Sequence, residues 1–431
     1  MRVVIVGGGF GGLTAARHLR DAPVEVMLLD RRNFHLFQPL LYQVATGGLS
    51  PANIAAPLRS ILRKQGNARV LLAEVTGFDL SRRRVICDDA EVEYDFLIVA
   101  AGSRHHYFGH DEWETYAPGL KTIEDALEIR RRVLLAFEAA EKEADSAEAA
   151  AYLTFVIVGG GPTGVELAGA IAEMARYTLK RDFRALQPAN ARIVLVEALP
   201  RVLPTYPEPL AREAEASLRR LGVDVLTSTT IEGLDEAAAL LKRNDKVQRI
   251  EARTVLWAAG NRTSSLAEAL RQASGAQADG AGRLFVAPDL SLPRYPEVFV
   301  VGDMARFEQD GQPLPAVAPV AIQEGAYVAQ VIRERLAGRQ PPKPFRYRNR
   351  GMMATIGRSA AVADFGWLRL HGFLGWIIWL TVHLLNLAQF ENRLLVLIQW
   401  AWNYFTYGRS ARLITWAPDA SAAGVPPANG A

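Results

Sequence analysis

Two glycine-rich loops, each preceded by a short apolar run and followed by a helical pattern, constrain the fold of this chain most strongly. The apolar run at residues 3–6 leads into a loop at residues 7–12, and the run at 155–158 leads into a loop at 159–164. Glycine at these positions permits a tight turn, close approach of the backbone to a pyrophosphate, and close packing of helix on strand. Each loop therefore predicts a dinucleotide-binding β–α–β unit.

An acidic residue ends the next apolar run after each loop. Asp30 follows residues 24–29, and Glu197 follows residues 192–196. A carboxylate at this point accepts hydrogen bonds from ribose hydroxyls, and it would repel a 2′-phosphate. We therefore expect the second unit to prefer NADH over NADPH, although Arg201 lies nearby. One such fingerprint is weak evidence, but two copies with the same order of parts are far stronger.

Three further apolar runs support this repeat. Residues 94–100 and 254–258 pass into Ala-Gly turns, and residues 298–301 end at an aspartate that can bond a ribityl or phosphate group. The order of parts inserts the second unit into the first. We expect an α/β fold with two Rossmann-like domains: an FAD-binding domain at 1–117 and 280–338, and an NADH-binding domain at 120–274.

Residues 122–143 are predicted to form a connecting helix. The two loops would then face each other, so that a nicotinamide can stack on a flavin.

The composition narrows the possible chemistry. The chain has 431 residues, half of them hydrophobic, which allows two or three domains. A formal net charge of +3 gives no case for nucleic-acid binding. The single cysteine, Cys87, excludes a disulfide within the chain and a cysteine-rich metal cluster, and the seven histidines show no metal-ligand spacing.

The loops, the aspartate at the end of the last strand and the order of parts resemble the pyridine nucleotide–disulfide oxidoreductase superfamily. Disulfide reductases and sulfide oxidation need cysteines that this chain lacks. Residues 37–51, 164–169 and 351–358 are similar to type II NADH:quinone oxidoreductases, and the resemblance runs over nearly the whole chain to about residue 414. It implies FAD as cofactor, NADH as substrate and a membrane quinone, ubiquinone or menaquinone, as acceptor, without proton pumping.

The resemblance also implies two sets of contact residues. Those for FAD are Gly7, Gly9, Phe10, Gly11, Gly12, Asp30, Arg31, Gln43, Ala101, Gly102, Asp303 and Ala321. Those for NADH are Gly159, Gly161, Pro162, Thr163, Gly164, Glu197, Ala259 and Gly260.

Two side chains are catalytic candidates. Glu166 lies in the first turn of the second nucleotide helix, where the family has a glutamate near nicotinamide and quinone; a glutamate there also simply complements the helix dipole. The family commonly carries Ala-Gln-x-Ala-x-Gln beside the flavin, where residues 318–323 here read Ala-Pro-Val-Ala-Ile-Gln. Gln323 is thus a candidate donor to a quinone carbonyl, or else a capping or core amide. Pro319 removes the other donor, which puts the quinone type and its binding in doubt.

Two apolar, Trp-rich runs lie near the end of the chain, at residues 373–390 and 394–405. A span needs about 20 apolar residues; the first run contains His383, Asn386 and Gln389, and the second is too short. Tryptophan and arginine suit the headgroup region, and the arginines that flank these runs are Arg358, Arg369, Arg393, Arg409 and Arg412. We therefore expect helices that lie in one leaflet, with a true span and a buried dimer interface as alternatives.

Residues 339–414 are thus expected to form a region for membrane association and dimerisation, and residues 418–431 a disordered tail. The protein would be peripheral (monotopic) on the cytoplasmic face of the cell inner membrane, in contact with the lipid bilayer surface, and the resemblance implies a homodimer. Two alternatives remain: a reductase of ferredoxin-type proteins, which leaves the Trp-rich segment unexplained, and an NADH-sensing flavoprotein that turns over slowly.

Overall fold

Parallel strands of apolar, mostly β-branched residues form the central sheet of the first unit. The computed structural model describes residues 1–340 and 342–415, so the predicted disordered tail at 418–431 lies outside the described residues. The strand order is β20–β21–β9–β1–β2–β5, and β20 runs antiparallel to its neighbour. These strands are β1 (Arg2–Val6), β2 (Glu25–Asp30), β5 (Ala68–Leu72), β9 (Phe96–Val99), β20 (Ser291–Leu292) and β21 (Tyr295–Val300). Residues 3–6 are fully buried, as expected of a parallel strand covered on both faces.

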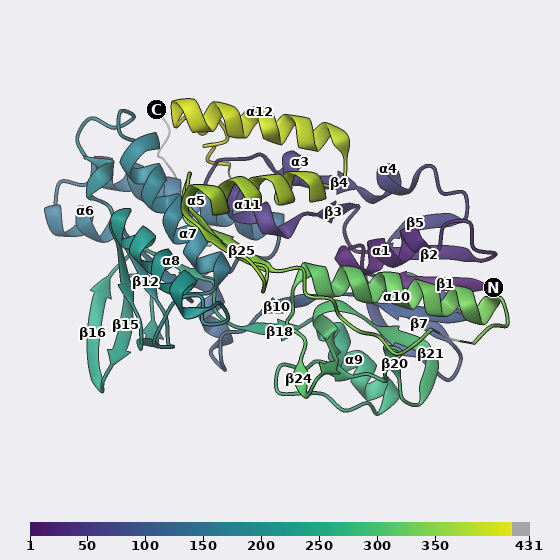
Figure 1. The fold of residues 1–431 in the computed structure, drawn as a ribbon. Helices are drawn as coiled ribbons and strands as arrows, with labels where there is room; N and C mark the ends of the chain where they lie inside the picture. Colours follow the sequence, from purple (N-terminus) through teal and green to yellow (C-terminus); the bar gives the residue numbers. More distant parts are fainter. Residues whose placement is uncertain (341, 416–431) are drawn as a thin grey trace.

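Helices cover one face of this sheet and a smaller sheet covers the other. Helices α1 (Phe10–His18) and α10 (Ala318–Leu336) lie side by side (Figure 1). A Cβ atom on Gly325 would stand 2.2 Å from the carbonyl oxygen of Gly11, so only glycine allows this close approach. The three-stranded sheet on the other face consists of β6 (Val75–Asp79), β7 (Arg84–Cys87) and β8 (Glu91–Glu93).

The second unit repeats this plan with a four-stranded parallel sheet of order β13–β12–β11–β17. Its strands are β11 (Thr154–Val158), β12 (Arg192–Val196), β13 (Val223–Leu226) and β17 (Thr254–Trp257). An antiparallel sheet of β14 (Thr230–Leu234), β15 (Ala238–Arg243) and β16 (Lys246–Glu251) extends from it. The helices around it are α5 (Ile123–Lys142), α6 (Ser146–Tyr152), α7 (Pro162–Glu173) and α8 (Glu208–Arg220). The helix predicted at residues 122–143 is therefore present, and it starts with a Thr122–Asp125 capping box.

The predicted boundary at residue 274 needs correction. Helix α9 (Ser265–Ser274) packs against β6, and its Ala267 and Leu270 belong to the same hydrophobic cluster as the first sheet. The chain returns to the first unit earlier, at β18 (Asn261–Thr263), which pairs with β10 (Ser103–His105). The pattern of an amphipathic helix does not show which sheet the helix will cover. For that reason α9 was predicted in the second unit, although it packs in the first.

Residues after 349 form a third region on top of both units (Figure 1). It consists of β25 (Met352–Thr355), β26 (Ala361–Asp364), β27 (Arg369–His371), α11 (Gly372–Asn386) and α12 (Phe390–Thr406). Strand β25 packs on α7, and α12 packs on α3 (Pro51–Ile54). Asn392 of α12 donates to three carbonyl oxygens of the chain around α3, at 3.1–3.2 Å. The C-terminal helices are therefore fixed to both nucleotide-binding units.

The outer face of α11 and α12 is apolar and uncovered. Phe390 is 77% exposed and Phe405 is 80% exposed. Other large apolar residues exposed on the two helices are Phe373, Leu374, Ile377, Leu385, Leu394, Leu395, Leu397, Ile398 and Trp402. Among the described residues, no helix has both the length and the apolar character that crossing a membrane requires. The two Trp-rich runs thus form two short helices, as expected.

Most arginines that flank these helices turn toward the protein. Arg409 faces Glu173 at 3.5 Å, and Arg412 pairs with Asp182. Arg393 donates to the carbonyl oxygen of Leu387 at 3.0 Å, and Arg358 donates to the hydroxyl of Tyr407 at 2.6 Å. These four flanking arginines therefore contact the protein, a direction that their positions along the sequence did not show.

Candidate active site

The first glycine loop forms a cradle that an added side chain would fill. Gly7 has a φ of +101°, in the left-handed region that favours glycine, and a Cβ atom on Gly12 would stand 1.9 Å from the carbonyl oxygen of Gly7. Nothing lies within 4 Å of a Cβ on Gly9. The carboxylate of Asp30 accepts from the backbone nitrogen atoms of Gly8, at 2.5 Å, and Arg32, at 2.7 Å. The open loop at the N-terminus of α1 thus fits a pyrophosphate.

The second loop has the same geometry. Gly159 has a φ of +108°, and a Cβ atom on Gly164 would stand 1.8 Å from its carbonyl oxygen. The buried carboxylate of Glu197 accepts from the backbone nitrogen atoms of Gly160, at 2.6 Å, and Leu199, at 2.7 Å. Pro162 and Thr163 open α7, and Gly161 is its N-cap. The two units predicted from the sequence therefore share the same loop geometry, and in each a carboxylate accepts hydrogen bonds from the loop backbone.

A two-stranded ribbon joins the two cradles. The turns Ala101-Gly102 and Ala259-Gly260 follow β9 and β17, and their glycines have φ values of +69° and +70°. The strands that continue these turns, β10 and β18, pair antiparallel with each other. The turns predicted to contact the two nucleotides thus meet at the junction of the two units.

Asp303 belongs to a polar cluster at this junction. Its Oδ2 atom accepts from the Ser103 hydroxyl at 2.5 Å, and the Lys121 ammonium donates to the same hydroxyl at 2.9 Å. Burial lowers the pKa of Lys121, while the charges of Asp303 and Asp125 oppose that shift. The sequence did not single out Lys121, because no motif marks its contact with Ser103.

Ala321 and Glu324 lie at the start of α10 beside the first cradle. A Cβ atom on Gly11 would stand 3.3 Å from the carbonyl oxygen of Ala321, and one on Gly302 would stand 3.3 Å from the Ala321 side chain. The fully buried Glu324 carboxyl accepts from the backbone nitrogen of Gly302 at 2.5 Å. Burial raises the pKa of Glu324 to about 8, and the charge of Asp303 adds to the shift. Glu324 is a second site residue that sequence reasoning missed.

Glu166 lies where the second unit meets the C-terminal region. It is the fifth residue of α7, so it lies beyond the first turn in which it was predicted. Its Oε1 atom accepts from the backbone nitrogen of Thr355 at 3.5 Å. Burial among these elements raises the pKa of Glu166 to about 8. Burial, with a smaller contribution from the charge of Glu166, raises the pKa of the hydroxyls of Tyr42 and Tyr206. The carboxyl is thus neutral near pH 7 and able to release a proton.

Gln43, predicted to contact FAD, joins Glu166's surroundings to α12. Its amide nitrogen donates to the Tyr42 hydroxyl at 2.9 Å, and its amide oxygen accepts from the Trp400 indole nitrogen at 2.7 Å. The Tyr42 hydroxyl therefore accepts one hydrogen bond, and among residues 1–340 and 342–415 it donates none. This short chain of contacts links the C-terminal helix to the neighbourhood of the candidate catalytic carboxyl.

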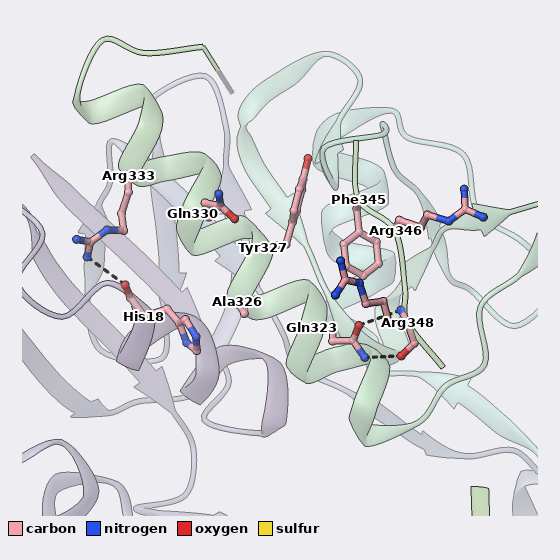
Figure 2. Close-up of a pocket in the computed structure, with 9 residues that line it drawn as sticks. All are labelled: His18, Gln323, Ala326, Tyr327, Gln330, Arg333, Phe345, Arg346 and Arg348. Carbon is pink, nitrogen blue, oxygen red and sulfur yellow. Dashed lines mark hydrogen bonds between the residues drawn. The ribbon is translucent and has the colours of Figure 1, made fainter. Parts of the chain in front are cut away.

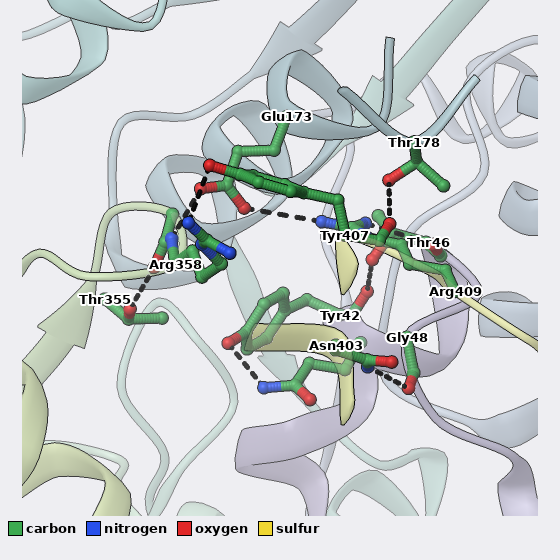
Figure 3. A network of polar contacts seen from close by, with 12 residues as sticks. Tyr42, Thr46, Gly48, Glu173, Thr178, Thr355, Arg358, Asn403, Tyr407 and Arg409 are labelled. Carbon is green, nitrogen blue, oxygen red and sulfur yellow. Dashed lines mark hydrogen bonds and ion pairs between the residues drawn. The ribbon is translucent and has the colours of Figure 1, made fainter. Parts of the chain in front are cut away.

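A second buried carboxylate, Glu173, ends α7 (Figure 3). It accepts from the backbone nitrogen of Arg358 at 2.5 Å and faces the guanidinium of Arg409 at 3.5 Å. Arg409 also donates to the carbonyl oxygen of Thr46 at 3.1 Å. Burial lowers the pKa of Arg409, which the charge of Glu173 opposes. This pair ties the chain after α12 to α7, and neither residue was predicted as part of the site.

Two predicted residues are placed away from the cradles. Both amide atoms of Gln323 bond the backbone of Arg348, at 3.0 Å each, on the outer side of α10 (Figure 2). Donation to a quinone carbonyl would require this amide to leave Arg348. Arg31 is 60% exposed and lies 3.9 Å from Glu74. Phe10, in contrast, packs edge-on against His35 and Phe37 next to the first loop.

Comparisons with known proteins agree with this geometry. Residues 1–325 match the family described as pyridine nucleotide-disulphide oxidoreductase, and residues 349–410 match the NDH2 C-terminal domain. The chain is 46% identical over 421 residues to the type II NADH:quinone oxidoreductase Ndh of Mycobacterium tuberculosis, covering 96% of this chain and 90% of the relative.

The chain belongs to the type II NADH:quinone oxidoreductases. A member of this family from Staphylococcus haemolyticus is 30% identical, with 83% of this chain and 87% of the relative covered. The structure of NDH2 from Plasmodium falciparum in complex with NADH has the same fold, with a TM-score of 0.87 at 21% identity over 95% of this chain and 99% of that chain.

Proposed function

We propose that this chain oxidises NADH and reduces a membrane quinone, ubiquinone or menaquinone, without pumping protons. The observation that carries the proposal is the position of Glu166. This carboxyl lies on α7, the helix that follows the second cradle, and accepts a hydrogen bond from Thr355 of the C-terminal region. The chain has a single cysteine, Cys87, and it is buried in the first unit, so a thiol pair is not the electron acceptor.

The residues present fit FAD in the first unit and NADH in the second. Four residues would hold FAD: Gly7, Gly12, Asp30 and Asp303. An added Cβ atom would fill the first loop, and the carboxylates of Asp30 and Asp303 lie near the ends of β2 and β21. Gly164 and Glu197 would hold NADH in the same way. Bound FAD would accept a hydride from NADH and pass two electrons to the quinone, chemistry that belongs to the cofactor.

The chain's own contribution is to hold a proton and exclude water. Glu166, with its pKa raised to about 8, keeps a proton at its carboxyl near neutral pH and can supply it as a reduced quinone takes up charge. The Tyr42 hydroxyl, held by Gln43, lies next in line toward α12. Glu324, whose pKa burial raises to about 8, instead holds the backbone of Gly302 beside Asp303.

We further propose that the exposed apolar face of α11 and α12 lies in one leaflet of the inner membrane, on its cytoplasmic face. Burying apolar side chains such as Phe390 and Phe405 in lipid favours this state. Quinone would then reach the site from the membrane side and NADH from water. A homodimer that uses part of the same C-terminal region is compatible with this attachment, and light scattering in detergent would measure its mass.

Steady-state acceptor preference tests the proposed reaction. Protein purified in detergent should consume NADH rapidly with a short-chain ubiquinone or menaquinone, and slowly with a ferredoxin. Rapid reduction of ferredoxin with no quinone reduction would instead favour the alternative reductase. Slow turnover with both acceptors would favour an NADH-sensing flavoprotein.

A further inference from the structure

A basic groove lies beside the apolar face of the C-terminal helices. It has a volume of about 850 Å³ and is bounded by the end of α1, by α4 (Leu58–Leu62) with the loop after it, and by the turn between α11 and α12. Four cationic side chains line it, together with the single carboxylate of Glu391. These cations are Arg17, Arg20, Arg63 and Lys64. The groove thus has the charge of an anion-binding site.

The cations of this groove are available to a ligand. Arg17, Arg63 and Lys64 are exposed, and within residues 1–340 and 342–415 they form no ion pair. Arg20 donates to the carbonyl oxygen of Lys64 at 3.0 Å, which holds the end of α1 against the loop after α4. Uncompensated cations gathered around one groove attract an anion more strongly than cations spread over a surface.

The groove continues into the apolar face. Its wall includes Phe390, which is 77% exposed and begins α12. The preceding residue, Gln389, donates to the Ser60 hydroxyl at 3.0 Å and thereby fixes the α11–α12 turn against α4. In a lipid, the phosphate headgroup adjoins the hydrocarbon chains. In this groove, cationic side chains likewise adjoin an apolar one.

The basic groove also supplies what the C-terminal region lacks. Arg358, Arg393, Arg409 and Arg412 are turned toward the protein and are engaged there. Helices that lie in a leaflet are usually accompanied by cations at headgroup level. In this fold those cations come from α1 and α4, more than three hundred residues earlier in the chain than α12.

We propose that the groove between α1, α4 and the α11–α12 turn binds the phosphate headgroup of an anionic lipid. The inference rests on the proposed attachment of α11 and α12 to a membrane, and it adds a headgroup preference to that attachment. The phosphate would lie among Arg17, Arg63 and Lys64, while Phe390 contacts the adjoining acyl chains. A free phosphate ion would satisfy the cations but would leave Phe390 in water.

Vesicle binding of two matched double variants tests the proposal. Flavin-loaded protein would be sedimented with vesicles of phosphatidylcholine alone, or of phosphatidylcholine mixed with phosphatidylglycerol. The wild type should prefer the mixed vesicles, and Arg63→Glu/Lys64→Glu should reduce binding to them by at least about tenfold while binding to neutral vesicles stays unchanged. The control Arg243→Glu/Lys246→Glu makes the same charge change at the exposed β15–β16 hairpin of the second unit and should keep the wild-type preference.

Two outcomes would overturn the headgroup site. The preference could survive in Arg63→Glu/Lys64→Glu, or it could fall equally in the control. Equal wild-type binding to both vesicle types would remove the headgroup preference alone, and no binding to either would remove membrane attachment as well. NADH oxidation with a water-soluble quinone in detergent should be unchanged in both variants, which keeps these outcomes separate from failure of the proposed reaction.

Discussion

The Oε1 atom of Glu166 lies 3.5 Å from the backbone nitrogen of Thr355, at the point where β25 ends against α7. This contact brings α7 and the C-terminal region together at one carboxyl. Burial at this junction raises the pKa of Glu166 to about 8. The consequences can be measured on stability as well as on turnover.

Stability should depend on pH through Glu166. A carboxyl whose pKa is raised in the folded protein favours the fold while it is protonated, so its contribution is complete at low pH and is lost as pH rises through about 8. Glu166→Gln cannot ionise and should therefore gain stability relative to the wild type between about pH 5 and about pH 9. Denaturant unfolding at several pH values measures the difference. Parallel curves for the two proteins would mean that Glu166 is ionised throughout.

Alanine at the last glycine of each loop should separate the two nucleotide sites. Gly164→Ala places a Cβ atom against the carbonyl oxygen of Gly159, and the cost of such crowding, about 1–3 kcal/mol, should weaken NADH binding roughly tenfold or more. Gly12→Ala should instead lower the amount of FAD retained on purification. Gly66→Ala, where nothing lies within 4 Å of the added atom, is the matched control. Loss of FAD in Gly164→Ala would contradict the assignment of the two cradles.

Gln323→Ala should affect stability more than quinone reduction. Its amide makes two hydrogen bonds to the backbone of Arg348, so their loss should cost about 1–2 kcal/mol of unfolding free energy. The KM for a short-chain quinone should stay within about twofold of the wild type if that pairing persists during turnover. A large rise in KM with unchanged stability would restore the role expected from the sequence.

Removal of Arg409 should destabilise the junction of α7 with the C-terminal segment. Arg409→Met leaves the buried Glu173 carboxylate without its cation, which typically costs about 3–5 kcal/mol. Glu173→Gln/Arg409→Met removes both charges and should recover much of that loss. Urea unfolding of the two variants measures both free energies of unfolding. Equal destabilisation would show that the loss of the charge pair does not cause the instability.

The repeated plan of two nucleotide units was predictable because it rests on local rules. Gly7–Gly12 and Gly159–Gly164 have spacings that few other structures require, and Asp30 and Glu197 follow at the same point of each unit. The amphipathic pattern of residues 122–143 likewise gave α5 nearly to its ends. For the two loops and α5, the order of residues along the chain alone determines which residues come into contact.

Contacts made between distant elements were not predictable in this way. Lys121 contacts Ser103 across 18 residues of sequence, and Glu173 meets Arg409 because the chain after α12 folds back over α7. The direction of a side chain also escapes a linear pattern, as the four flanking arginines that contact the protein show. The proline at position 319 fits the fold, because Pro319 lies in the first turn of α10, where proline is favoured.

The most direct test of the proposed reaction records flavin absorbance without oxygen through two additions. NADH should bleach the flavin, and a short-chain ubiquinone or menaquinone should then restore its absorbance quickly. The Glu166→Gln variant should bleach normally and recover at least about tenfold more slowly, since it cannot supply the proton. Bleaching by NADH with no recovery on addition of quinone to the wild type would contradict the account.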